Sequence, residues 1–383
     1  MQTRQEYDYI ILGAGLSGLM LACRLEDDAF FNNKKILLLD SSKKSENDRT
    51  WCFWKTDSGY WDRVVSKRWS RVIFKSSRFS KEIDLAPYTY NKIEGKDFYE
   101  YCFDRLSLAK NITFKIERVN NFKDTEDGVE VLTEKGEYLA KKVFTSILPK
   151  KRLKEQTYSQ VLQQHFIGWF IKTEEPVFKP EAATFMDFAI PQRGNTRFMY
   201  VLPTSSNEAL IEYTLFSENL LPDEEYETAI KDYLLELGVK KYSVVQTEKG
   251  SIPMTDYPFE LHNTRNIMHI GTAGGWTRGS TGFTFNYSDK LSQNLIGFLK
   301  TETDFKKFNL NNRFRWYDRL FLDVLYRRND LGSEIFTAMF QNNKIEVIFR
   351  FLDGESTLME DLKLIWSLPK LEFVKAFFRK GIR

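Results

Sequence analysis

The sequence predicts an α/β fold with three parts: an N-terminal β-α-β unit, a mostly antiparallel β-sheet and a helical C-terminal region. Two short apolar strands, 7–12 and 35–39, flank a glycine-rich turn and an apolar helix, and a crossover of this kind makes the strands parallel. Strand-like segments between 166 and 216 follow one another through short polar turns, which favours antiparallel pairing. From residue 286 onward the pattern is helical.

The composition is that of an ordinary globular chain that is longer than one typical core. Of its 383 residues, 42% are apolar and 28% are charged, and the formal net charge is +3. This balance excludes a disordered chain and lacks the basic excess typical of proteins that bind nucleic acid. The three cysteines form no CxxC pair and the three histidines no HExxH motif. We therefore expect no disulfide framework, no metal site and a cytoplasmic, reducing compartment.

Aromatic residues make up 15% of the chain. They indicate either an aromatic-rich core or the lining of a long apolar cavity, since such side chains line small-molecule sites. No stretch reaches the roughly 18 uninterrupted apolar residues of a membrane span.

The first turn carries a glycine motif typical of a Rossmann-type dinucleotide site. Gly13, Ala14, Gly15 and Gly18 follow the first strand, and Asp40 ends the second strand 22 residues after the last glycine. Such glycines allow a tight turn, close approach of a pyrophosphate and close packing of helix on strand, and the acid accepts hydrogen bonds from a ribose. The motif predicts a dinucleotide but leaves NAD and FAD open.

A second glycine-rich turn, 271–275, follows another short strand about 250 residues downstream. A long flavin that crosses the domain needs such a late element, which an NAD dehydrogenase does not, so the turn favours FAD. We expect Ser280 or Thr281 to cap a following helix, whose positive end would stabilise negative charge on a reduced flavin. An ordinary loop-to-helix connection is the alternative.

Two acids and one arginine are candidate site residues. Glu212 lies in the second strand of a predicted hairpin, 197–216, among aliphatic and aromatic neighbours, where burial raises the pKa of a carboxyl as a general acid requires. Asp187 lies in a similar strand, and either acid is otherwise a solvent-facing carboxylate. Arg49, in the segment 47–54, is expected near the cofactor, where it contacts phosphate or stacks on an aromatic ring.

The last residues predict a basic amphipathic helix. Leu371, Val374, Phe377 and Phe378 fall near one face, and 370–383 holds five basic residues and one acidic residue. Such a helix suits an anionic membrane surface, and it equally suits docking on its own domain.

Five motifs together resemble bacterial lycopene β-cyclases. The resemblance spans nearly the whole chain in the same order and continues into the C-terminal region. The motifs are NDRTW at 47–51, QHFIGW at 164–169, TFMD at 184–187, YVLP with IEYT at 200–214, and GTAGGW with STGFTF at 271–285.

The resemblance implies an FAD-dependent flavoprotein with an aromatic-hydroxylase-like fold. Such enzymes convert the linear ψ-ends of lycopene to β-ionone rings, giving γ- and β-carotene, by acid–base chemistry without net redox change. The family is thought to use FAD in its reduced form, with NADPH or NADH as the electron source. Lycopene is an apolar C40 polyene, so a membrane surface is the expected source of substrate, and we expect a cytoplasmic, peripherally membrane-associated protein.

The resemblance also assigns roles to individual residues. It makes Glu212 the proton donor and leaves the final proton acceptor open between Asp187, water and the flavin. Thr272 stands where related flavoproteins carry an aspartate, which weakens transfer of the ribityl contact from those relatives to this chain. The cofactor positions it implies are Gly13, Gly15, Gly18, Asp40, Gly274, Gly275 and Thr281.

The expected domains are discontinuous. The FAD-binding domain would comprise 1–75, 96–155 and 250–300, the substrate-binding sheet 76–95 and 156–249, and the helical region 301–383. The alternative functions are an FAD-dependent monooxygenase, a polyprenyl reductase of the same superfamily, or a non-enzymatic escort for lipid-modified proteins.

Overall fold

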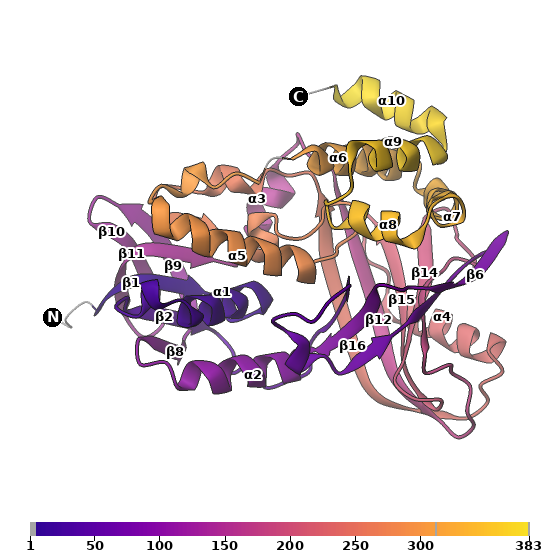
Figure 1. Cartoon of the computed structure of the whole chain (residues 1–383), viewed down its shortest axis with the longest axis horizontal. Helices are drawn as coiled ribbons and strands as arrows, with labels where there is room; N and C mark the ends of the chain where they lie inside the picture. The colour runs from indigo at the N-terminus through magenta and orange to yellow at the C-terminus, as the bar shows by residue number, and fades with distance from the viewer. Residues whose placement is uncertain (1–4, 311, 382–383) are drawn as a thin grey trace.

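Two β-sheets lie side by side in the computed structural model, which describes residues 5–310 and 312–381. Within these residues each of the two sheets has seven strands, and a three-stranded sheet of β3 (Thr50–Lys55), β7 (Thr89–Glu94) and β4 (Lys67–Trp69) accompanies them. The first large sheet lies toward the N-terminus, and the C-terminal helices cover the second (Figure 1). No helix of the described residues is both long and apolar enough to cross a membrane.

The first sheet contains the predicted β-α-β unit. β1 (Gln5–Leu12) pairs in parallel with β2 (Ile36–Asp40) on one side and with β11 (Glu137–Thr145) on the other. The helices α1 (Leu16–Asp27) and α5 (Phe285–Thr301) pack against each other beside this sheet. The strand order is β8 (Ile112–Ile116), β2 (Ile36–Asp40), β1 (Gln5–Leu12), β11 (Glu137–Thr145), β10 (Gly128–Thr133) and β9 (Val119–Thr125), with β17 (Ile267–His269) paired to β11. Both glycine-rich turns therefore follow strands that pair in parallel with β11, namely β1 and β17.

The second sheet is antiparallel except where β13 pairs with β5. Its order is β16 (Tyr242–Thr255), β12 (Val161–Thr173), β15 (Glu208–Ser217), β14 (Thr196–Pro203), β13 (Ala182–Asp187), β5 (Arg71–Ser76) and β6 (Phe79–Asp84). β14 and β15 form the predicted hairpin, with Tyr200 opposite Glu212. Ile211 and Tyr213 point toward the helix α4 (Asp223–Glu236), whereas Leu210 and Phe216 pack with the C-terminal helices.

The strand pairing differs from the expected division of the chain. The expected FAD-binding domain includes residues 71–75. These residues lie in β5, which belongs to the second sheet and pairs with β13. The expected boundary at 249/250 also falls inside β16. An apolar run indicates a strand, but it carries no information about which distant strand becomes its partner.

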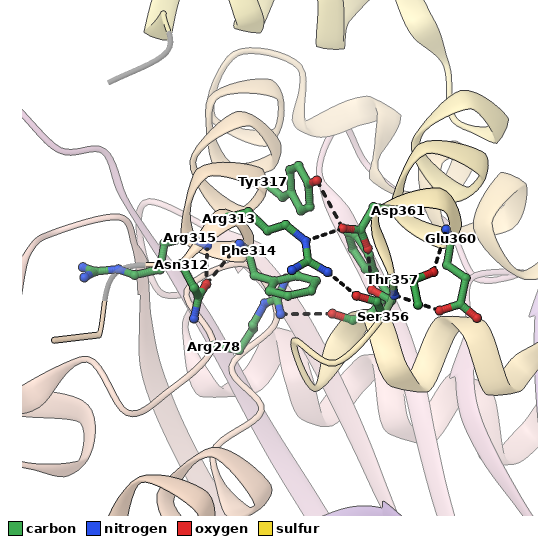
Figure 2. Close-up of polar contacts among 11 residues, drawn as sticks. Arg278, Asn312, Arg313, Phe314, Arg315, Tyr317, Ser356, Thr357, Glu360 and Asp361 are labelled. Atoms are coloured by element: carbon green, nitrogen blue, oxygen red, sulfur yellow. Dashed lines mark hydrogen bonds and ion pairs between the residues drawn. The ribbon is translucent and has the colours of Figure 1, made fainter. Parts of the chain in front are cut away.

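The helical C-terminal region covers one face of the second sheet (Figure 1). Figure 2 shows how the start of its first helix is held: the Arg313 guanidinium donates to Asp361 (2.7 Å), and the Tyr317 hydroxyl donates to the same carboxylate (3.2 Å). The second glycine-rich turn begins a longer segment, 271–282, which we call the second glycine-rich segment. Arg278 of this segment donates to the carbonyl of Leu352 (3.1 Å), which ties the segment to the helices. The helices are α6 (Arg313–Arg327), α7 (Gly332–Asn342), α8 (Ile345–Leu352), α9 (Leu358–Ser367) and α10 (Lys370–Lys380).

The C-terminal helix α10 is docked on its own domain and still exposes apolar side chains. Arg379 Nε donates to Asp323 of α6 (2.8 Å), and Ala376 is fully buried. Leu371 and Phe378 nevertheless remain 67% and 79% exposed. Docking of α10 on its own domain is therefore compatible with contact between its exposed apolar side chains and a membrane surface.

Candidate active site

A cavity of about 360 Å³ lies where the two large sheets meet, and it collects residues from motifs far apart in the sequence. The first glycine turn contributes Gly15, and the segment around β3 contributes Arg49. The second sheet contributes Glu212, and the second glycine-rich segment contributes Thr272 and Thr281. The structure thus brings most of the predicted site into one place.

The three glycines of the first turn have different roles. Gly13 has φ +105°, and a Cβ there would lie 2.1 Å from Ser146 Oγ. A Cβ on Gly18 would lie 1.9 Å from the Gly13 carbonyl oxygen, so this position is needed for helix–strand packing. At Gly15 a Cβ would meet nothing within 4 Å, and the residue lines the cavity. Gly15 therefore leaves the backbone open to a ligand, as a dinucleotide site requires.

Asp40 holds the first turn in shape. Its carboxylate accepts hydrogen bonds from the backbone N–H of Ala14 (2.8 Å) and of Ser42 (2.8 Å). A carboxylate has about four acceptor sites, so capacity for a ribose hydroxyl remains. Lys44 and Arg49 line the cavity together with Asp48, and Lys44 Nζ lies 4.0 Å from Asp40 Oδ2; these two cations are the groups at this end that can contact a pyrophosphate.

The second glycine turn also faces the cavity. Gly271 has φ +61° and lines the cavity, whereas a Cβ on Gly274 would lie 2.0 Å from the His269 carbonyl oxygen. Gly275 has φ +73°; it does not line this cavity but faces a neighbouring, more polar one. The turn therefore depends on glycine at each of these positions, and Gly271 is the one that approaches the candidate ligand space.

The predicted helix cap is wrong. α5 begins at Phe285, and Thr284 precedes it without a capping bond from its side chain. Ser280 instead donates to Asp318 (2.6 Å), because the chain makes one more turn before the helix starts. Thr281 lines the cavity, and its Oγ1 is buried without a hydrogen-bond partner among residues 5–310 and 312–381. An unpartnered buried hydroxyl at this point fits a polar cofactor edge.

Glu212 and Glu248 form a buried carboxyl pair in the cavity wall. Glu212 accepts a hydrogen bond from the Thr214 hydroxyl (2.5 Å), and Glu248 accepts one from the Thr50 hydroxyl (2.8 Å). Burial raises the pKa of Glu212 well above its usual value, and the negative charge of Glu248 raises it further. Burial also raises the pKa of Glu248, against the opposing effect of Thr50 and Arg49. The pair therefore retains a proton that isolated carboxyls would release.

Glycine in the central strand makes room for this pair. Gly168 of β12 lies opposite Glu212 of β15 on one side and opposite Glu248 of β16 on the other. A Cβ on Gly168 would lie 3.3 Å from Glu248 Cγ and 3.5 Å from Glu212 Cβ. Sequence analysis missed Glu248; the available signal was the glycine inside a strand motif, which marks a close approach of other groups.

Asp187 does not join Glu212. Its carboxylate accepts a hydrogen bond from the Tyr233 hydroxyl of α4 (2.9 Å) and lies 3.5 Å from Lys75 Nζ, on the face of the sheet away from the cavity. The pairing of β13 with β14 shifts register between Thr184 and Asp187, so simple alternation does not apply there. Asp187 connects the sheet to α4.

Aromatic rings form much of the remaining cavity wall. Tyr90 and Tyr200 hydrogen-bond to each other next to Cys52, and burial raises the pKa of the Cys52 thiol to about 12, so this cluster is uncharged. No group of three or more His, Cys, Asp or Glu side chains in the described part of the chain is arranged to hold a metal ion. The aromatic residues are Trp51, Tyr90, Tyr99, Phe166, Phe185, Phe198, Tyr200, Phe216, Phe283, Phe285 and Phe336.

Comparison with known proteins gives a family and a fold. The model of the family described as "Lycopene cyclase protein" matches residues 8–377. The chain is 22% identical to a lycopene beta-cyclase of Pantoea ananas over 97% of both chains. It is 23% identical to a lycopene beta-cyclase of Paracoccus sp. (strain N81106 / MBIC 01143) over 76% of this chain and 73% of that one.

Solved structures share the fold at low sequence identity. A flavin-dependent brominase aligns over 98% of this chain and all of its own, with TM-score 0.66 and 13% identity. A p-nitrophenol 4-monooxygenase of Pseudomonas putida aligns over the full length of both chains, with TM-score 0.61 and 12% identity. The expected α/β fold of the aromatic-hydroxylase type is confirmed.

Proposed function

The chain belongs to the lycopene cyclase family, and on that basis we propose that it converts the linear ψ-ends of lycopene to β-ionone rings by acid–base cyclisation. The observation that carries the proposal is the buried Glu212–Glu248 pair in a cavity that both glycine turns also line. A carboxyl that stays protonated at neutral pH in an apolar site is the group that protonation of an unactivated double bond requires.

We propose FAD as the resident cofactor. The open backbone at Gly15 and the cations Lys44 and Arg49 would hold the pyrophosphate, and Thr272 and Thr281 would lie beside the ring. FAD in its reduced form, kept reduced by NADPH or NADH, would supply negative charge that stabilises a cationic transition state.

Protonation is assigned to Glu212. Its carboxyl releases its single proton from the hydrogen bond shared with Glu248 to the terminal double bond, while the Thr214 hydroxyl continues to donate to the other oxygen. The faces of the surrounding aromatic rings attract the carbocation that forms and closes the ring. A second proton then leaves the new ring. The deprotonated pair is an acceptor already within the cavity, so we assign the return of the proton to it, and the reaction is a net isomerisation.

Co-expression with a lycopene-producing pathway tests this proposal. A cyclase gives a pigment of unchanged mass with a blue-shifted absorption spectrum. A monooxygenase would add the mass of oxygen, and a polyprenyl reductase would add the mass of hydrogen and consume one NADPH per bond. Either mass change, or lycopene left intact by a flavin-loaded protein, contradicts the proposal.

Glu248→Gln is expected to move the pH dependence of cyclisation. Activity requires a proton on the pair, so it is present at low pH and lost as pH rises through the raised pKa of Glu212. Because the charge of Glu248 contributes to that raised pKa, its removal shifts the alkaline limb of the kcat–pH profile to lower pH. An alkaline limb that stays in place or moves to higher pH would show that the two carboxyls are not coupled.

We further propose that the protein is cytoplasmic and associates peripherally with membranes through α9 and α10. Trp366 and Phe378 are 73% and 79% exposed, and Lys363 and Lys370 lie on the same two helices. Exposed apolar side chains beside cations are typical of interfacial helices.

Replacing Trp366 and Phe378 together by Asp is expected to abolish flotation with vesicles of mixed neutral and anionic lipids. The matched control is Leu108→Asp, because Leu108 is 83% exposed at the end of α2 (Gly95–Ser107), far along the chain from α9 and α10. Flotation of the double variant at the wild-type level, or equal loss in the control, would place the membrane contact elsewhere.

A further inference from the structure

A second cavity, of about 470 Å³, lies beneath α9 and α10. Its walls come mainly from the helices α6 to α10 and are almost entirely apolar, with Leu320, Phe321, Met339 and Phe373 among them. The charged residues in the lining are Asp318, which is bound by Arg278 and Ser280, and Lys370, which lies over the Trp366 ring. A cavity with such walls selects a ligand without polar groups.

This cavity adjoins the active-site cavity. Thr281 and Phe336 line both cavities, one from the second glycine-rich segment and one from α7. The Phe336 side chain therefore marks the point at which a long ligand with one end beside Glu212 would reach the second cavity. The volume of each cavity falls within the range of about 300–1,000 Å³ that is typical of small-molecule sites.

Its outer end opens between α9 and α10, and apolar side chains form the rim. Leu362 and Trp366 of α9 and Val374 and Phe378 of α10 all line this cavity and are 50–79% exposed. Figure 1 shows α10 at the outer edge of the C-terminal region, with α9 beneath it. Lys370 Nζ lies 3.9 Å from the centre of the Trp366 ring, which puts a cation at the same rim. A rim of this kind suits the boundary between lipid chains and headgroups.

We propose that this second cavity is a channel that holds the part of the polyene not being cyclised, and that the polyene enters it from the bilayer between α9 and α10. The inference rests on the proposed function and assigns a second binding site to the same substrate. Only one end of a linear C40 chain reacts at a time, and the rest loses contact with water or lipid only if an apolar enclosure continues beyond the active site.

Val374→Trp tests the channel against the matched variant Leu371→Trp. Both residues are exposed on α10, at 50% and 67%, but Val374 lines the cavity and Leu371 does not. The substrates are lycopene and a short linear polyene that carries the same ψ-end, both supplied in detergent micelles. We expect Val374→Trp to lower kcat/KM for lycopene by about tenfold or more and to leave the short substrate near the wild-type rate. Leu371→Trp should leave both unchanged.

Photo-crosslinking gives a readout that does not depend on turnover. A diazirine-bearing amino acid in place of Val374 should form an adduct with lycopene, and the same group in place of Leu371 should not. No adduct at Val374, or equal loss of both substrates in Val374→Trp, would overturn the channel. If the wild-type protein cyclises lycopene in the same preparation, that failure leaves the proposed function standing, whereas an inactive, flavin-loaded wild type contradicts the function itself.

Discussion

Glu212→Gln is expected to lower lycopene turnover by about 10²–10⁴-fold while flavin binding stays near the wild-type level, because the variant removes one general acid and keeps its shape. The amide still accepts the hydrogen bond from Thr214, and it fills the same space next to Gly168. It has no carboxyl proton to donate. The measurement is product formation from lycopene by separated pigments, with flavin content read from absorbance on the same protein.

The variant should also differ from the wild type in stability. The pKa of Glu212 is raised in the folded chain, so the folded state holds that proton more tightly than the unfolded state. This contribution to stability is fully present below the unfolded pKa of about 4.3 and is lost as pH rises through the folded pKa. Glutamine has no such loss, so Glu212→Gln should unfold at the same or a higher temperature than wild type at alkaline pH. A lower melting temperature there would attribute the lost activity to misfolding.

Glu208→Gln is the matched control for this substitution. Glu208 lies on the same strand, β15, but forms an exposed ion pair with Lys172 (3.1 Å). Such pairs contribute about 0–1 kcal/mol, so the control should cyclise and fold like the wild type. Cyclisation at the wild-type rate by Glu212→Gln would rule out Glu212 as the acid.

Local patterns in the sequence predicted the parts of the site that local chemistry determines. Gly13 is required by its φ of +105° and Gly18 by its approach to the Gly13 carbonyl oxygen, so the spacing within one turn indicates both. Glu212 was placed by alternation along a regular strand, which keeps Leu210 and Thr214 on the same face. In both cases the physical cause lies within a few residues of the motif.

The remaining features depend on strand register between distant segments. Glu248 meets Glu212 only because β15 and β16 both pair with β12 at Gly168. Asp187 points away because of an irregularity in the pairing of β13 with β14, which the residues of β13 do not reveal. The position of Phe336 in the walls of both cavities likewise requires α7 to pack on the second sheet. None of these relationships is encoded in a short motif.

Gly15→Val is expected to weaken FAD binding by about 100-fold or more while the protein without flavin folds normally. Gly15 has φ −82° and ψ −168°, an extended conformation that valine adopts readily, and a Cβ there meets nothing within 4 Å. The added methyl groups therefore occupy only the open space that we assign to the pyrophosphate. Flavin affinity is measured by titration of the flavin-free protein, and folding by its melting temperature.

Two other glycine variants serve as controls for this experiment. Gly18→Val brings a Cβ to 1.9 Å from the Gly13 carbonyl oxygen, so it should destabilise the flavin-free protein itself. Gly297→Ala lies on α5 with nothing within 4 Å, and it should keep flavin affinity and gain about 0.5–1 kcal/mol of stability. If Gly15→Val bound FAD as tightly as the wild type, the first glycine turn would not be the pyrophosphate site. Loss of folding in Gly15→Val alone would equally show that the open space at this turn is needed by the protein rather than by a ligand.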